Sequence, residues 1–140
     1  MISSNGSASG KSTTSAGNVF VSTYTGNNTN QWWSIERENG VFIQPGTTLL
    51  EDGEYYLNSR STSKYLRNVS GSVQGANGTT AALGTSIKWK FTNMGGKYLI
   101  QPANNTSLYL SGGSTTDNSV RLVTLASSIP SECLWTVTKS

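Results

Sequence analysis

The sequence predicts an all-β fold made of three repeated units. Almost every apolar run is short and bounded by Gly, Asn, Ser or Pro, which is typical of strands joined by tight turns. No window shows a helical period of apolar residues. One phrase, a tryptophan, any residue and then an apolar residue, occurs three times. The copies are at 33–35, 89–91 and 135–137.

Short apolar runs ahead of these phrases predict further strands. The three that precede the tryptophans are 19–21, 81–83 and 120–123. Apolar runs elsewhere predict three more strands, at 55–57, 64–66 and 108–110. Two further predicted strands, at 41–45 and 98–102, share the ending Ile-Gln-Pro. In 87–91, two lysines alternate with Ile, Trp and Phe, so this strand has one apolar face.

A single unit of this kind cannot bury its apolar face alone. Three units around a shared axis would close a barrel and remove most exposed strand edges. We therefore predict one β-trefoil domain over residues 1–140, with Trp33, Trp89 and Trp135 as its structural core. The units are expected at approximately 1–50, 51–94 and 95–140.

Composition argues against nucleic-acid binding and catalysis. Only 12% of the residues are charged, and the ten Lys and Arg are scattered, whereas a nucleic-acid interface needs a clustered basic face. The absence of histidine excludes Ser–His–Asp and Cys–His catalysis and His-based metal sites. Glu36 and Glu38 are interpreted as a solvated turn rather than as a catalytic pair. We expect no enzyme activity, no cofactor and no metal.

The single cysteine and the apolar runs bear on where the protein works. Cys133 has no disulfide partner within the chain and lies in an apolar run, so it is expected to be a buried thiol. No apolar run approaches the roughly 20 residues of a membrane span, and the first residues lack the apolar stretch of a signal peptide. We expect no membrane insertion, and a protein that is cytoplasmic or released without a signal peptide.

The phrase NQWW at 30–33 resembles the Gln-x-Trp signature of the ricin-B-type (R-type) β-trefoil lectins. Segments 54–66 and 108–113 are similar to that family's opening strands and the turn after them. The other two tryptophans lack the glutamine, and the chain is expected to begin inside a unit. The resemblance is therefore to a divergent or permuted member.

The resemblance implies a lectin that binds terminal galactose or N-acetylgalactosamine through its first unit. Asn30 would bond the sugar hydroxyls, and Gln31 beside it would be mainly structural. The family's stacking aromatic falls near Ser22, so Tyr24, on the same strand face, is expected to stack instead. The family's sugar-binding aspartate has no counterpart near residues 1–3.

Loop length ranks the units independently of the resemblance. Unit one has 12 residues from Val21 to Trp33, and its loop contains Asn28 among other hydrogen-bonding groups. Unit two has only 6 from Leu83 to Trp89, with 84–86 as the turn, and is predicted to be scaffold. Unit three has 13 residues from Leu122 to Trp135. It is a weaker second candidate, with Gly112, Asp117 and Asn118 before its strand and Glu132 in place of Asn30.

Several alternatives stay open for these residues. Trp32 faces outward by strand alternation, for ligand contact, for contact with a second copy, or as ordinary surface. Asn28 and Asn30 would equally serve as turn residues, and Tyr24 as a cross-strand packing residue. The expected partners are glycans or glycoproteins, and a homodimer would raise avidity.

Two other functions fit a trefoil of this composition. One is a protease inhibitor that presents a loop near 128–130 or the segment 45–50. The other is a structural or toxin-associated module without a sugar site.

Overall fold

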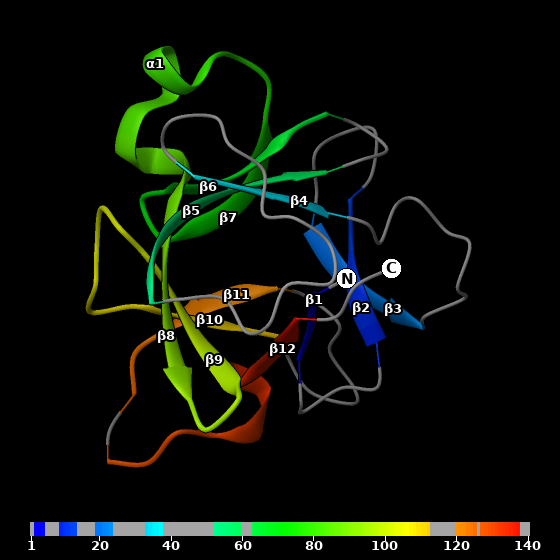
Figure 1. The fold of residues 1–140 in the computed structure, drawn as a ribbon, viewed down its shortest axis with the longest axis vertical. Helices are drawn as coiled ribbons and strands as arrows, with labels where there is room; N and C mark the ends of the chain where they lie inside the picture. The colour runs from blue at the N-terminus through cyan, green and yellow to red at the C-terminus, as the bar shows by residue number, and fades with distance from the viewer. Residues whose placement is uncertain are drawn as a thin grey trace.

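The computed structural model describes residues 2–4, 9–13, 19–23, 33–37, 52–59, 63–112, 120–125 and 127–137. Within them, twelve β-strands fall into three groups of four (Figure 1). Unit one has β1 (Ile2–Ser4), β2 (Ser9–Thr13), β3 (Val19–Thr23) and β4 (Trp33–Glu36). Unit two has β5 (Gly53–Ser59), β6 (Tyr65–Val69), β7 (Ser72–Ala76) and β8 (Lys88–Met94). Unit three has β9 (Lys97–Pro102), β10 (Tyr109–Ser111), β11 (Arg121–Val123) and β12 (Trp135–Val137).

The strand pairing follows a threefold pattern. The first strand of each unit pairs antiparallel with the last strand of the preceding unit: β5 with β4, β9 with β8, and β1 with β12. The two middle strands of each unit form a hairpin: β2 with β3, β6 with β7, and β10 with β11. This arrangement is the predicted β-trefoil. Because β1 pairs with β12, these two strands lie side by side (Figure 1), and β1 is the first strand of its unit. The expected start inside a unit is therefore wrong.

The repeat tryptophans occupy one register. Each pairs across to an equivalent position on the first strand of the next unit, and these pairs are Trp33 with Ser59, Trp89 with Pro102, and Trp135 with Ser4.

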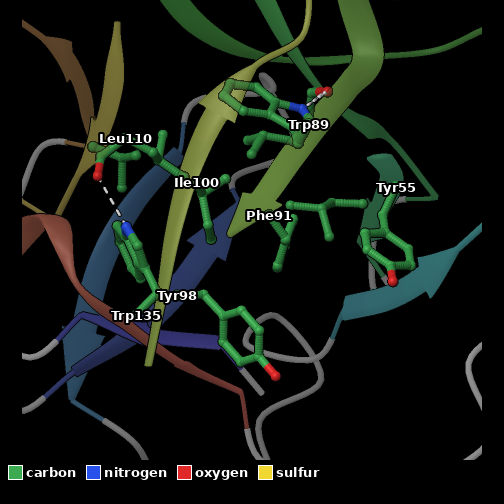
Figure 2. Packing of buried hydrophobic residues seen from close by; sticks show 10 residues of the cluster. Tyr55, Trp89, Phe91, Tyr98, Ile100, Leu110 and Trp135 are labelled. Carbon is green, nitrogen blue, oxygen red and sulfur yellow. Dashed lines mark hydrogen bonds between the residues drawn. The ribbon is translucent and has the colours of Figure 1, made fainter. Parts of the chain in front are cut away.

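Trp89 and Trp135 are fully buried, as the sequence predicts. The indole Nε1 of Trp89 donates a hydrogen bond to the carbonyl of Leu66 at 2.8 Å, and that of Trp135 donates to Leu110 at 2.9 Å (Figure 2). These acceptors remove the cost of burying an unpaired indole N–H. Each bond ties a barrel strand to the hairpin of its own unit. The side chain of Trp33 lies outside the described residues.

Aromatic rings from successive first and last strands fill the space beside the two indoles (Figure 2). Tyr55 meets Phe91 edge-on with ring centroids 5.4 Å apart, and Phe91 lies 5.9 Å from Tyr98 in a tilted arrangement. Such geometries are favoured by the charge distribution of the rings. Leu57 of β5 and Ile100 of β9, which lie on either side of β8, complete this part of the core with no exposed surface.

One predicted strand is wrong. Residues 81–83 belong to a helical turn, α1 (Thr80–Leu83), followed by a single 3-10 turn, η2 (Gly84–Ile87). The side chain of Thr79 accepts a hydrogen bond from the Ala82 backbone N–H at 3.1 Å and so caps this turn. The third strand of unit two is instead β7, which has one buried residue, Ala76, and therefore little apolar signal.

The remaining strand predictions within the described residues are confirmed, with bounds that shift by a few positions. The predicted strand at 41–45 lies outside them. Unit three has one further 3-10 turn, η3 (Ser131–Cys133), placed before its tryptophan as η2 is in unit two. The helices in the described part of the chain are single turns, far too short for a membrane span.

Cys133 is a buried free thiol, as predicted. Burial, and then the charge of Glu132, raise the pKa of this thiol from 9.0 to about 11, although a hydrogen bond with the Ser111 side chain lowers it in part. The thiol is therefore neutral in the folded protein at physiological pH.

Replacing Trp89 with Phe should lower the free energy of unfolding by about 2–3 kcal/mol, because it removes the hydrogen bond to Leu66 and part of a buried ring. Urea unfolding would measure this change. Met94→Leu, at an exposed position on the same strand, is the matched control and should shift stability by less than about 0.5 kcal/mol. Equal stability of Trp89→Phe and the native protein would contradict a structural role for the indole bond.

Ionisation of Cys133 should make the folded protein less stable at high pH. Above pH 9 the unfolded thiol loses its proton, whereas the folded thiol keeps its proton until about pH 11. The stability that the neutral thiol contributes is therefore fully present below pH 9 and is lost as the pH rises from 9 to 11. Urea midpoints for the native protein and Cys133→Ala at pH 7, 9 and 10.5 would test this. The native midpoint should fall more steeply, whereas parallel curves would exclude a contribution from the thiol.

Candidate functional site

Most of the predicted first-unit site lies outside the described residues. This applies to Tyr24, Asn28, Asn30, Gln31 and Trp32. Ser22 is described as a backbone position in β3, where it pairs with Gly10. In unit three, Gly112 is described and buried, whereas Asp117 and Asn118 are outside the described residues.

The hairpin register nevertheless relates the three units. Leu66 and Leu110 are equivalent because each accepts the indole bond of its own unit, and their hairpin partners are Gly75 and Leu122. Ser3 and Asn58 are equivalent, because each directly precedes the residue that pairs with a repeat tryptophan. Ser3 pairs with Gly10 and Asn58 pairs with Tyr65, so Gly10 of unit one is equivalent to Tyr65 of unit two. Lys11, which follows Gly10, therefore takes the place of Leu66, and its partner is Val21.

This register overturns the ranking of the units by loop length. Counted from the equivalent positions Val21, Gly75 and Leu122, the distance to the repeat tryptophan is 12 residues in unit one (33−21), 14 in unit two (89−75) and 13 in unit three (135−122). The segment before the tryptophan of unit two is therefore not shorter than those of the other units. The expectation that its loop is too small to form a site is wrong, because it counted from 81–83 as a strand.

The segment before Trp89 packs against the hairpin of unit two. Arg67 of β6 is half-buried, and its Nε donates a hydrogen bond to Ser86 Oγ of η2 at 3.2 Å. Ser86 Oγ in turn donates to the carbonyl of Leu83 at 2.5 Å. Across the hairpin, Arg67 pairs with the exposed Gln74 of β7, whose amide donates to Ser72 Oγ at 3.4 Å. We call Arg67, Gln74, Leu83 and Ser86 the unit-two rim.

The corresponding part of unit three is closed by a backbone bond. The Gly112 N–H donates to the carbonyl of Glu132 at 2.9 Å, and the buried Ser111 reaches the Cys133 thiol. Gly112 therefore has no free N–H for a ligand here. Loop residues follow β11 toward η3, and Ile129, in the predicted inhibitor loop, is 36% exposed.

Two positions give the rims different chemistry. The position three residues before the tryptophan is Asn30, Ser86 or Glu132 in units one, two and three. The position after the equivalent of Leu66 is Ser12, Arg67 or Ser111. Unit one therefore combines neutral groups, unit two carries a base, and unit three carries an acid. Sequence reasoning missed Arg67 because its equivalence to Ser111 depends on strand pairing, although their shared place after Tyr-Leu is visible in the chain.

Glu36 corrects another sequence interpretation. It lies in β4 with only 9% of its surface exposed, rather than in a solvated turn, and accepts a hydrogen bond from the Tyr65 hydroxyl at 3.1 Å. Tyr56 packs edge-on against Tyr65 with centroids 6.0 Å apart. Burial, and then the Glu36 carboxylate, raise the pKa of Tyr65. Glu36 thus joins unit one to the hairpin of unit two, while Glu38 lies outside the described residues.

Metal ligands do not gather anywhere in the described part of the chain. No group of three His, Cys, Asp or Glu side chains there could hold an ion.

Comparison of the sequence with protein-family models and with curated proteins gives no match. Solved structures do match over 99% of the chain. A designed three-fold symmetric protein, ThreeFoil, superposes with a TM-score of 0.74 at 19% identity, and the match covers 96% of that protein. A GlcNAcα1-4Gal-releasing endo-β-galactosidase from Clostridium perfringens matches with a TM-score of 0.76 at 13% identity. A mosquitocidal holotoxin matches with a TM-score of 0.73 at 17% identity.

The chain spans nearly the whole of the designed protein but only 31% of the galactosidase and 17% of the holotoxin. At these identities the likeness concerns the fold alone. It agrees with the strand pairing, and the chain is a three-unit β-trefoil.

Proposed function

We propose that the chain is a carbohydrate-binding module of the lectin type. The observation that supports this proposal is that the same fold forms a small part of larger proteins. The chain matches less than a third of a glycan-cleaving enzyme and less than a fifth of a mosquitocidal holotoxin. A small trefoil within such proteins suits recognition of a surface glycan, with the chemistry carried by the rest of the protein. We accordingly propose no catalytic activity for this chain.

The first unit is the proposed main site, for terminal galactose or N-acetylgalactosamine. Asn30 has the same offset from its tryptophan as Ser86, whose hydroxyl meets the hairpin residue Arg67 in unit two. The hairpin residue at that register in unit one is Ser12, so the first rim combines a neutral amide with a neutral hydroxyl residue. Neutral donors and acceptors suit the hydroxyls of an uncharged sugar.

Other residues complete this proposed site. Tyr24 would stack on the sugar ring, and Ser22, Asn28 and Gln31 would line the pocket. Trp32 would contact the ligand or a second copy of the chain, since a homodimer would combine weak sites into one avid surface. A second, weaker site in unit three would involve Asp117 and Asn118, with Gly112 contributing shape rather than a hydrogen bond.

A glycan array that contains terminal galactose and N-acetylgalactosamine would test the proposal. We expect binding by the native chain and at least a tenfold loss with Asn30→Ala, because truncation leaves the sugar hydroxyls without their amide partner. Asn77→Ala is the matched control, because Asn77 is an exposed asparagine in the turn after β7, and should leave binding unchanged.

A blank array from correctly folded protein would refute the proposed function. If the same protein inhibited a papain-like or trypsin-like protease, the alternative of an inhibitor that uses the loop around Ile129 would replace it.

A further inference from the structure

We infer that the unit-two rim binds an anionic group on a saccharide, a sulfate ester or a carboxylate, through Arg67. This inference rests on the proposed function, since it assumes that the ligand is a glycan. It adds a second specificity in a unit that differs from the proposed neutral site in unit one.

The Arg67 guanidinium is held in place before any ligand arrives. Its Nε donates to Ser86 Oγ at 3.2 Å, and Ser86 is itself anchored to the Leu83 carbonyl at 2.5 Å. Arg67 is also half-buried on β6, where it meets the turn η2. A guanidinium fixed at Nε keeps its plane, and its two Nη groups remain as donors. Pre-organisation of this kind lowers the entropy lost on binding.

Within the part of the chain that the structure describes, Arg67 forms no ion pair, and its polar bond is the one to Ser86. Its neighbour across the hairpin is the neutral, exposed Gln74. A half-buried arginine with a neutral anchor attracts an anion, and its planar donors match the paired oxygens of a carboxylate or sulfate. Gln74 would supply a neutral donor or acceptor beside it.

The four residues of the unit-two rim include no aromatic ring that could stack on an uncharged sugar. Ala76 takes the register of Ser22, so it offers no ring for stacking. Tyr65, two residues before Arg67 on β6, directs its hydroxyl to Glu36 instead. Charge is therefore the main source of affinity at this rim.

The third unit has different residues at these two positions. It carries Ser111 where unit two has Arg67, and Glu132 where unit two has Ser86. A carboxylate at this position repels an anionic ligand. Arg121 lies in the same hairpin of unit three, in the register of Gln74, and is exposed. Arg121 therefore provides a matched arginine outside the proposed site.

The experiment compares three probes by isothermal titration at low salt: lactose, 3′-sulfated lactose and 3′-sialyllactose. The native chain should bind at least one charged probe at least tenfold more tightly than lactose, and added salt should reduce this difference. Arg67→Gln should abolish the difference and leave lactose binding unchanged. Arg67→Lys should keep only part of it, because the ammonium lacks the planar pair of donors. Arg121→Gln removes the same charge and should keep the full difference.

Several results would overturn the inference. A charged-probe advantage that survives Arg67→Gln, or that falls equally with Arg121→Gln, would assign the effect to general charge. Ser86→Ala keeps the charge but frees Nε, and should weaken the charged probes several-fold; thermal unfolding would verify that each variant folds.

The probes also separate the two proposals. Lactose binding without a charged-probe advantage would refute the anionic site and leave the lectin proposal standing. Failure of all three probes to bind would refute the anionic site, and a blank glycan array would then refute the lectin proposal as well. Binding of the sulfated probe alone would assign a sulfate ester, and binding of the sialylated probe alone would assign a carboxylate.

Discussion

The hydrogen bond from a buried indole to a hairpin carbonyl is the constraint on which the rest of this structure depends. Trp89 reaches back 23 residues to Leu66, and Trp135 reaches back 25 residues to Leu110. Because an indole N–H buried without an acceptor is costly, this bond favours the register in which the indole reaches the hairpin carbonyl. That register also sets which residue follows the accepting carbonyl and faces the segment ahead of the tryptophan. The rim is thus a consequence of core packing.

A constant scaffold with variable rims follows from this arrangement. The core positions repeat with similar residues, as with Leu57 and Ile100 or Tyr55 and Tyr98. The rim positions differ in charge from unit to unit, since Arg67, Ser86 and Glu132 are only partly buried and packing restricts them less than the core. A trefoil with three identical rims would gain avidity for one ligand. Under the proposed function, unlike rims would instead bind different chemical groups of one branched or modified glycan.

Threefold symmetry is also broken at the seams between units. Glu36 and Tyr65 join β4 to the hairpin of unit two through a part-buried hydrogen bond. The equivalent residue on β8, three positions after Trp89, is Thr92, which is uncharged. A carboxylate that looked solvated in the sequence is therefore part of the framework, because the tyrosine that covers it comes from a hairpin 29 residues further along the chain.

The sequence by itself determined the all-β class, the three tryptophan-centred units and the buried state of Trp89, Trp135 and Cys133. These features depend on local alternation and on residue size, both of which are readable along the chain. Only the tertiary structure decided that α1 replaces a strand, that β7 completes its hairpin, and that Arg67 meets Ser86. The physical reason is that β7 has almost no apolar signal of its own and owes its strand state to pairing with β6. Contacts between residues distant in sequence therefore determine which residues form the rim, whereas the local sequence pattern determines which residues form the core.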